Sequence, residues 1–231
     1  MSYKKIQRMT LAMRTNHWVV AISMLVAIVT GLYIGHPYYQ SFISDPAVDK
    51  YVMAWNRLAH LIVAIIFDVS SVIVAYLYFF SRFEKPYKKL IPNINNIKEF
   101  FEVLMNLITL NRIKKFDSSY TDSFNSVFFF VFHMMLVWML FTGLQLYVHG
   151  LASGLSSIGS WWPYMLHMIT DWTVAVSGGT YMDVRISHHN VMYWIIAWII
   201  FHVYYQIWRT IFWKEADISI VVGGCKFVKE D

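Results

Sequence analysis

Four long apolar stretches constrain the fold of this chain more than any other feature of its sequence. They cover about residues 17–34, 55–80, 125–148 and 188–212. An α-helix of about 20 mainly apolar residues crosses the hydrocarbon core of a bilayer and satisfies its own backbone hydrogen bonds there. The sequence therefore predicts an all-α membrane protein in which these stretches form a bundle of four transmembrane helices.

Composition excludes most soluble folds and several kinds of redox centre. Hydrophobic residues make up 58% of the 231 residues and charged residues 14%, more apolar surface than a soluble domain of this size buries. The length suits a single domain over residues 1–231. The one cysteine, Cys225, excludes internal disulfides, cysteine-ligated iron–sulfur clusters and haem attachment through C-x-x-C-H. Any redox cofactor must therefore be held by other side chains.

Two segments between the stretches are predicted to form helices that do not cross the membrane. Residues 94–110 lie in a polar, basic connection and carry apolar residues at helical spacing, as an interfacial amphipathic helix does. These apolar residues are Ile94, Ile97, Phe101, Leu104 and Ile108. Residues 161–176 are aromatic but too short to span the bilayer. We expect them to form a helix on the outer surface.

The positive charges predict which side of the membrane the ends of the chain face. Sixteen of the nineteen Lys and Arg residues lie in the N-terminal segment, in residues 82–120, or from Arg209 onward. Four spans place these three segments on one side, and cytoplasmic loops carry the excess of cations. Both termini are therefore predicted to be cytoplasmic. The basic N-terminal segment leads into an apolar run without a small-residue cleavage site, so we expect a retained helix.

Four histidines sort into two pairs by their depth in the membrane. His188 and His202 are fourteen residues apart, which places them within roughly 40° of one helix face and about 21 Å apart along the axis. The predicted orientation puts His60 and His188 near the periplasmic side, and His17 and His202 near the cytoplasmic side. A haem iron takes axial imidazoles from facing helices of a bundle. The pattern fits two b-type haems, each held by one of these pairs.

The histidines also have plainer interpretations. A histidine near the end of a span is often an interfacial polar residue. His133, about eight residues into the third stretch, competes with the four as a ligand. His189 points about 140° away from His202, so His188 is the better ligand of the adjacent pair. Solvated roles are expected for His36, His149 and His167.

Two further features inside the spans leave more than one interpretation open. Asp68 lies about twelve residues into the second stretch, where an unpaired carboxylate is costly. We expect it to face the bundle interior with His133 as a candidate partner, either as a structural pair or in a proton relay. The Thr-Gly pairs at 30–31 and 142–143 either leave room for a haem or allow close packing of helices.

Several short motifs together resemble one family of membrane cytochromes. They are RTNHW at 14–18, TG at 30–31, NRLAH at 56–60, RISHH at 185–189 with His202 following, and DISIVVGGCKF at 217–227. The set covers nearly the whole chain and resembles the cytochrome b subunit of membrane-bound, quinone-reactive nickel–iron hydrogenases. That di-haem cytochrome b family is related to the gamma subunits of formate dehydrogenases. Thr15 and Ile186 depart from the usual residues of the family, and neither is a proposed ligand.

The resemblance implies that His17, His60, His188 and His202 ligate two b-type haems. It also implies an electron-transfer subunit, without chemistry on hydrogen itself, that anchors periplasmic small and large hydrogenase subunits to the bacterial inner membrane as a multi-pass protein. Electrons would enter at His60 and His188, cross to His17 and His202, and reduce a membrane quinone in a respiratory chain. The lipid bilayer is the remaining expected partner, and no nucleic acid is expected.

Two other functions stay open on the sequence. The cytochrome b subunit of a formate dehydrogenase or a thiosulfate reductase would share the fold and the ligands, although the tail at 217–227 favours the hydrogenase type. A small proton or metal transporter would instead use the intramembrane histidines and Asp68. Such a transporter would purify colourless, whereas a cytochrome b absorbs visible light.

Overall fold

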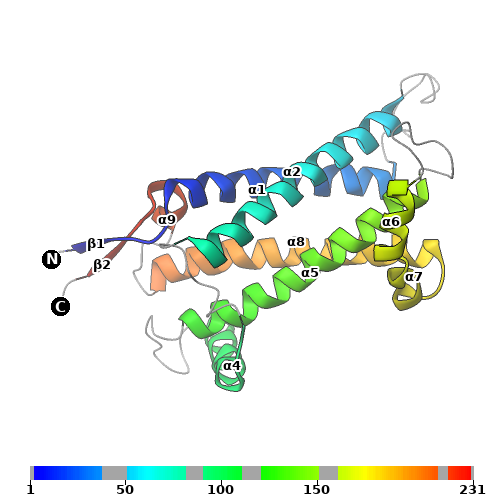
Figure 1. The fold of residues 1–231 in the computed structure, drawn as a ribbon. Helices are drawn as coiled ribbons and strands as arrows, with labels where there is room; N and C mark the ends of the chain where they lie inside the picture. Colours follow the sequence, from blue (N-terminus) through cyan, green and yellow to red (C-terminus); the bar gives the residue numbers. More distant parts are fainter. Residues whose placement is uncertain are drawn as a thin grey trace. The chain divides into compact units, whose positions relative to one another are not determined.

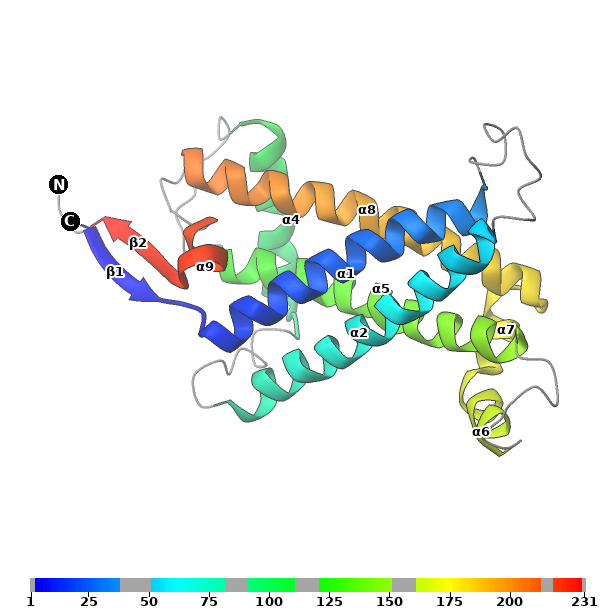
Figure 2. The same cartoon turned by 90° about the horizontal axis from the view of Figure 1, so that it is seen from above.

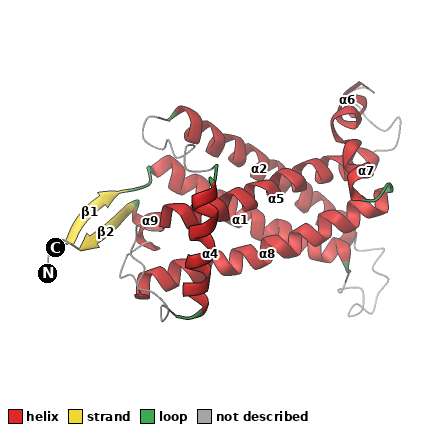
Figure 3. Ribbon diagram, turned by 90° about the horizontal axis from the view of Figure 1, so that it is seen from below, coloured by secondary structure: helices red, strands yellow, loops and turns green. Residues whose placement is uncertain are grey.

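The computed structural model describes residues 3–37, 51–81, 91–110, 121–150, 161–212 and 218–229. These residues are mostly helical (Figures 1 and 3). The described helices are α1 (Leu11–Gly35), α2 (Val52–Phe80), α4 (Ile94–Ile108), α5 (Thr121–Gly150), α6 (Trp161–Thr170), α7 (Trp172–Ser177), α8 (Tyr181–Phe212) and α9 (Ile218–Gly223). The described strands are β1 (Tyr3–Gln7) and β2 (Cys225–Lys229).

Four of the helices are long and apolar enough to cross a membrane. The qualifying parts are Leu11–Gly35, Val52–Phe80, Phe124–Gly150 and Tyr181–Ile211. Large apolar side chains stand exposed along these helices, as they do where a protein faces lipid; examples on α2 are Val69, Val72 and Tyr76. The prediction of a helical membrane protein with four spans is therefore confirmed.

The last span, α8, begins two turns earlier than the sequence predicts. The predicted start is His188, whereas the helix begins at Tyr181. The backbone N–H of Thr180 donates to Asp183 Oδ2 at 3.0 Å, and the N–H of Asp183 donates to Thr180 Oγ1 at 3.2 Å. Such a reciprocal cap satisfies N–H groups that have no acceptor inside the helix. His188 therefore lies about 10 Å inside the helix rather than at its end.

The chain forms two compact units. Unit 1 comprises Met1–Phe130 and Ile200–Asp231, and unit 2 comprises Val131–Ile199. Helices α5 and α8 each contribute one part to unit 1 and the other part to unit 2. Unit 1 also contains α1, α2, α4, α9 and both strands, whereas unit 2 contains α6 and α7.

Within unit 1, α1 and α2 pack side by side (Figure 2). The side chain of Asn16 donates through Nδ2 to the backbone oxygen of Ser70 at 3.0 Å, and both residues are buried. Further along α1, Thr30 contacts His60 of α2. The first contact joins the beginning of α1 to the later part of α2, and the second joins the end of α1 to the earlier part of α2. The two helices therefore run antiparallel, as in a helical hairpin.

A two-stranded sheet joins the two ends of the described chain and was not predicted from the sequence. Strands β1 and β2 pair antiparallel, with Tyr3 opposite Lys229 and Gln7 opposite Cys225 (Figure 1). Because the two strands pair with each other outside the four spans, they lie on the same side of the membrane. An even number of spans requires this arrangement. That this side is the cytoplasm stays a prediction.

Two side chains tie the first turns of α1 to α9. Arg14 donates through Nη1 to the backbone oxygen of Val222 at 2.6 Å, and Trp18 donates through Nε1 to the backbone oxygen of Val221 at 3.0 Å. These carbonyls lie in the last turn of α9, where a helix leaves its carbonyl oxygens without intrahelical donors. The contacts therefore satisfy the end of α9 and fix it beside the segment of α1 that carries His17.

Gly224 completes this connection through its backbone conformation. The N–H groups of Arg8 and Met9 donate to its carbonyl oxygen at 2.8 and 3.1 Å. Its φ is +76°, and a Cβ placed there would lie 2.7 Å from the backbone oxygen of Met9. Only glycine adopts such a conformation at little cost and permits so close an approach. We call the contacts of residues 221–224 with residues 8–18 the terminal clamp.

Helix α4 forms where the amphipathic pattern predicts it. Asn93 and Asn96 form a reciprocal cap at its start, each side chain accepting the other residue's backbone N–H at 2.9 Å. Among the predicted apolar stripe, Ile94, Phe101 and Ile108 are exposed. An exposed apolar face is what a helix at a membrane surface presents to lipid. The helix is confirmed, and its place at the interface stays a prediction.

The outer helix predicted over residues 161–176 is two helices. Helix α6 ends at Thr170 and α7 begins at Trp172, with Asp171 between them. The N–H of Asp171 still bonds to the carbonyl of His167 at 2.9 Å, so the chain continues as a helical turn across the break. Hydrogen bonds of the Asp171 side chain with Gln145 and His167 hold this turn in place.

Candidate functional site

His17 and His202 lie together within unit 1. His17 is six residues after the start of α1, and His202 is in the part of α8 that belongs to unit 1. Their imidazoles are close enough to repel each other electrostatically when both are protonated. The structure thus brings together, from two membrane-spanning helices, the histidines assigned to the cytoplasmic pair. Their role as haem ligands stays a prediction.

The surroundings of this pair are aromatic. The ring of Phe128 stacks on that of His202 with 6.4 Å between centroids, and the ring of Phe129 meets it edge-on at 5.9 Å. Trp18 meets the ring of His17 edge-on at 5.8 Å. Nδ1 of His17 is buried, and no hydrogen-bond partner for it lies among the described residues. An apolar, aromatic lining with a few convergent polar atoms is typical of cofactor sites.

His60 is held by a threonine of the neighbouring helix. In unit 1, Thr30 Oγ1 of α1 lies 2.9 Å from Nδ1 of His60 on α2. The same oxygen lies 2.8 Å from the backbone oxygen of Val26, one turn earlier in α1. Thr30 is buried and His60 is half-buried. Thr30 therefore holds the imidazole of His60 at Nδ1, and the backbone of Ala27 in α1 also interacts with this imidazole.

His188 is held in the same manner in unit 2. Thr142 Oγ1 of α5 lies 2.8 Å from Nδ1 of His188 on α8, and 2.7 Å from the backbone oxygen of Trp138. A Cβ at Gly143 would lie 3.4 Å from Cε1 of the same imidazole. This is an ordinary van der Waals distance, so both interpretations of the Thr-Gly pair at 142–143 stay predictions.

The two histidines of the periplasmic pair belong to different units, His60 to unit 1 and His188 to unit 2. Each has its own contacts within its unit, and their pairing around one haem stays a prediction. The same holds for Asp68 and His133, which also belong to different units. Asp68 is half-buried on α2, and it forms no hydrogen bond or ion pair among the described residues.

The remaining histidines do not gather around these sites in the described chain. His189 packs edge-on against Tyr193, with 5.1 Å between ring centroids, and His149 stacks on Tyr181 at 3.6 Å. His36 is the exposed C-cap of α1. Within the described ranges, no three His, Cys, Asp or Glu side chains cluster as a metal site would need. A haem needs only two imidazoles, so pairs suffice for it.

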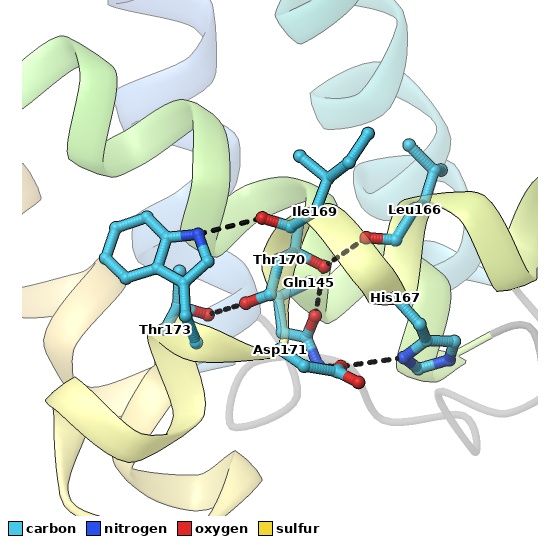
Figure 4. Close-up of polar contacts among 8 residues, drawn as sticks. Gln145, Leu166, His167, Ile169, Thr170, Asp171 and Thr173 are labelled. Atoms are coloured by element: carbon cyan, nitrogen blue, oxygen red, sulfur yellow. Dashed lines mark hydrogen bonds and ion pairs between the residues drawn. The ribbon is translucent and has the colours of Figure 1, made fainter.

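A buried polar network in unit 2 joins α5 to α6 and the break before α7 (Figure 4). Gln145 and Thr170 are fully buried, and the Thr170 hydroxyl is hydrogen-bonded to Gln145 Oε1. Gln145 donates through Nε2 to Asp171 Oδ1 at 3.0 Å. Nδ1 of His167 lies 2.9 Å from the same carboxylate oxygen. His167 is thus a partner of Asp171 rather than only a solvated residue, and their i, i+4 spacing is the signal in the sequence.

This network predicts that the packing of α6 and α7 depends on pH. The hydrogen bond from His167, with a second from Gln145, holds the pKa of Asp171 below its ordinary value of 3.8. A depressed carboxyl pKa contributes stability that is present above the ordinary value and lost as the pH falls through the lower one. We expect hydrogen exchange of residues 161–177, corrected for the intrinsic rate, to increase only below about pH 4.

The variant Asp171→Asn provides the control for this prediction. It removes the titrating group, so exchange of residues 161–177 should show no step below about pH 4. Because the Asp171 side chain is 58% exposed, the loss at neutral pH should stay under about 1 kcal/mol. An acid step of equal size in the variant would contradict the assignment to Asp171.

Comparison with known proteins places this chain among membrane cytochromes. Residues 8–224 match the family model described as prokaryotic cytochrome b561. A protein of Azotobacter chroococcum mcd 1 named "Probable Ni/Fe-hydrogenase B-type cytochrome subunit" is 27% identical over 221 residues, which is 95% of this chain and 87% of that protein. Proteins of the same name from Cupriavidus necator and Rhodobacter capsulatus are each 25% identical, covering 94% of this chain and 85% and 80% of their own lengths.

The match and the fold agree with each other. The matched residues include all four spans and the four histidines of the two predicted pairs. A membrane cytochrome b carries b-type haem and transfers electrons, which agrees with histidines placed within membrane-spanning helices. The chain is a multi-pass integral membrane protein, and it belongs to the prokaryotic cytochrome b561 family.

Proposed function

We propose that this chain is the membrane-anchor cytochrome b subunit of a nickel–iron hydrogenase. In this role it carries electrons from periplasmic small and large subunits through two b-type haems to membrane quinone in the inner membrane. The observation that carries the proposal is the electrostatic proximity of His17 and His202, from α1 and α8, in an aromatic region of unit 1. The relatives named as hydrogenase B-type cytochrome subunits support the choice of partner.

The residues present fit a bis-histidine haem. Such a haem takes one imidazole from each of two facing helices and packs its faces and edges against apolar side chains. Helices α1 and α8 each supply one histidine, and Phe128 and Phe129 flank His202. For the second haem, His60 and His188 each lie about two turns inside a membrane-spanning helix. Their depths agree, and depth is the basis on which we pair them.

The chain's own residues have four tasks in this function. A b-type haem, when bound, supplies a one-electron couple, and the protein sets its position, ligand geometry and surroundings. The histidines fix where electrons enter and leave, the helices set the separation along the membrane normal, and the aromatic lining excludes water. The terminal clamp holds the first turns of α1, and with them His17, on the side of the membrane where quinone would be reduced.

The proposed direction follows from topology. Cations concentrated in the segments around β1 and β2 favour the cytoplasm for that side, as the positive-inside rule requires. His60 and His188 then face the periplasmic subunits, and His17 and His202 face the cytoplasmic leaflet. Electrons would enter at the first pair and leave at the second, where quinone takes up protons from the cytoplasm.

Copurification tests the function. The chain, tagged and isolated in mild detergent with its partners, should bring down nickel in the complex, and hydrogen gas should reduce its b-type absorbance bands. Added quinone should then reoxidise them. Molybdenum or tungsten in place of nickel would indicate a formate dehydrogenase or thiosulfate reductase complex. A colourless chain would contradict any cytochrome function.

A further inference from the structure

Two threonines make the same pair of contacts, one in each unit. Thr30 lies 2.9 Å from Nδ1 of His60 and 2.8 Å from the carbonyl oxygen of Val26. Thr142 lies 2.8 Å from Nδ1 of His188 and 2.7 Å from the carbonyl oxygen four residues earlier. In both cases one hydroxyl oxygen faces a histidine nitrogen on one side and a backbone carbonyl on the other.

The proton positions in each triad follow from what each group can donate. A carbonyl oxygen can only accept a hydrogen bond, and a threonine hydroxyl carries one proton. At 2.7 to 2.8 Å from the carbonyl, the hydroxyl proton must lie between the two oxygens, because two acceptors would otherwise repel. The hydroxyl oxygen then has only lone pairs left for the histidine. Nδ1 of the histidine must therefore be the donor and carry the imidazole proton.

We propose that Thr30 and Thr142 are positioning residues that fix His60 and His188 in the Nδ1–H tautomer and so present the lone pair of Nε2 to a haem iron. This inference rests on the proposed function, in which these two histidines are the axial ligands of one haem. A neutral imidazole binds a metal through the nitrogen that lacks the proton, and the hydrogen bond at the other nitrogen decides which one that is.

The same hydrogen bonds set the electronic character of the ligands. An acceptor at Nδ1–H makes the imidazole a stronger electron donor through Nε2, and second-shell partners of this kind typically change metal affinity by 10–100-fold. Stronger donation favours ferric over ferrous iron and therefore lowers the reduction potential. In contrast, Nδ1 of His17 is buried with no hydrogen-bond partner in the described parts of the chain. The haem of His60 and His188 is thus the one whose potential the threonines lower.

Valine variants of the full-length protein in its complex test this inference. Thr30→Val and Thr142→Val keep the shape of the side chain but remove the hydroxyl. Each should raise the reduction potential of one haem, in an optical redox titration, by a shift equivalent to about a tenfold change in the ferric-to-ferrous ratio, or about 59 mV for one electron. The second haem should keep its potential and serve as the internal reference. The ferric electron paramagnetic resonance signal of the shifted haem should change as well.

Two further variants separate the hydroxyl from general packing. Thr30→Ser and Thr142→Ser retain the hydroxyl, so both should keep the wild-type reduction potential. They should do so even if the corresponding valine variant loses the haem altogether. Thr210→Val is the matched control, because Thr210 also bonds to the carbonyl four residues earlier, at 2.9 Å, without contacting a histidine in the described chain. The inference would be overturned if the valine variants shifted the reduction potentials of both haems equally, or shifted neither. It would also be overturned if Thr210→Val shifted a potential, or if the serine variants lost the haem.

Histidine variants distinguish this inference from the proposed function. If His60→Ala or His188→Ala kept both haems, the ligand assignment itself would be wrong. If these variants lost one haem while the valine variants left its potential and resonance signal unchanged, only the role of the threonines would be refuted.

Discussion

Replacing His188 by alanine is expected to lower the b-haem content of the purified complex from about two per chain to about one. On the proposed assignment, the variant removes one of the two imidazoles that would hold the haem shared with His60. A haem held by a single imidazole in a detergent-solubilised protein is readily lost. A pyridine haemochrome assay against protein concentration measures the loss, and reduction of the remaining haem by hydrogen should fail because electrons would enter at the missing one.

Neighbouring histidines supply the controls for this prediction. His189 is adjacent to His188 and packs on Tyr193, so His189→Ala should keep both haems. His60→Ala should reproduce the His188→Ala result, since the two are proposed to share one haem. Loss of haem in the His189 variant equal to that in the His188 variant would refute the assignment.

Replacing Gly224 by alanine is expected to open the terminal clamp. A non-glycine residue at a φ of +76° is strained, and its Cβ would lie 2.7 Å from the backbone oxygen of Met9. Strain of this kind costs about 1–3 kcal/mol, so hydrogen exchange in β1 and β2 should become about 5- to 150-fold faster. The absorbance of the haem assigned to His17 should broaden, because Arg14 and Trp18 would lose their acceptors in α9.

The adjacent glycine is a matched control. Gly223 ends α9, and a Cβ there meets nothing within 4 Å. Gly223→Ala should therefore leave exchange in both strands near the wild-type rate. If both alanine variants behaved alike, the clamp would not depend on the backbone conformation of Gly224.

The spans and α4 could be predicted because hydrophobic periodicity and length decide them locally. The start of α8 could not be placed from the apolar run alone, because the cap between Thr180 and Asp183 extends the helix beyond it. The T-x-x-D pattern after two glycines was the available signal. The consequence for the site is direct, since it moves His188 from the end of the helix to two turns inside it.

Features that depend on distant partners were beyond prediction from this sequence alone. The pairing of β1 with β2 joins opposite ends of the chain, and no local pattern in either strand indicates its partner. The break at Asp171 is fixed by Gln145 on another helix. Thr30 and Thr142 could be recognised as small residues beside glycine, but their contacts with His60 and His188 require the packing of two helices.

The terminal clamp also has a consequence for biosynthesis. Strand β1 leaves the ribosome before β2, and at about 5–20 residues per second the chain between them takes about 10–45 s to make. During that time the first turns of α1, including His17, lack the α9 carbonyls that later hold them. A stalled or truncated chain never acquires them. The clamp can therefore close only after all four membrane-spanning helices have been synthesised. Stable binding of a cofactor at the His17 end should accordingly follow translation rather than accompany it.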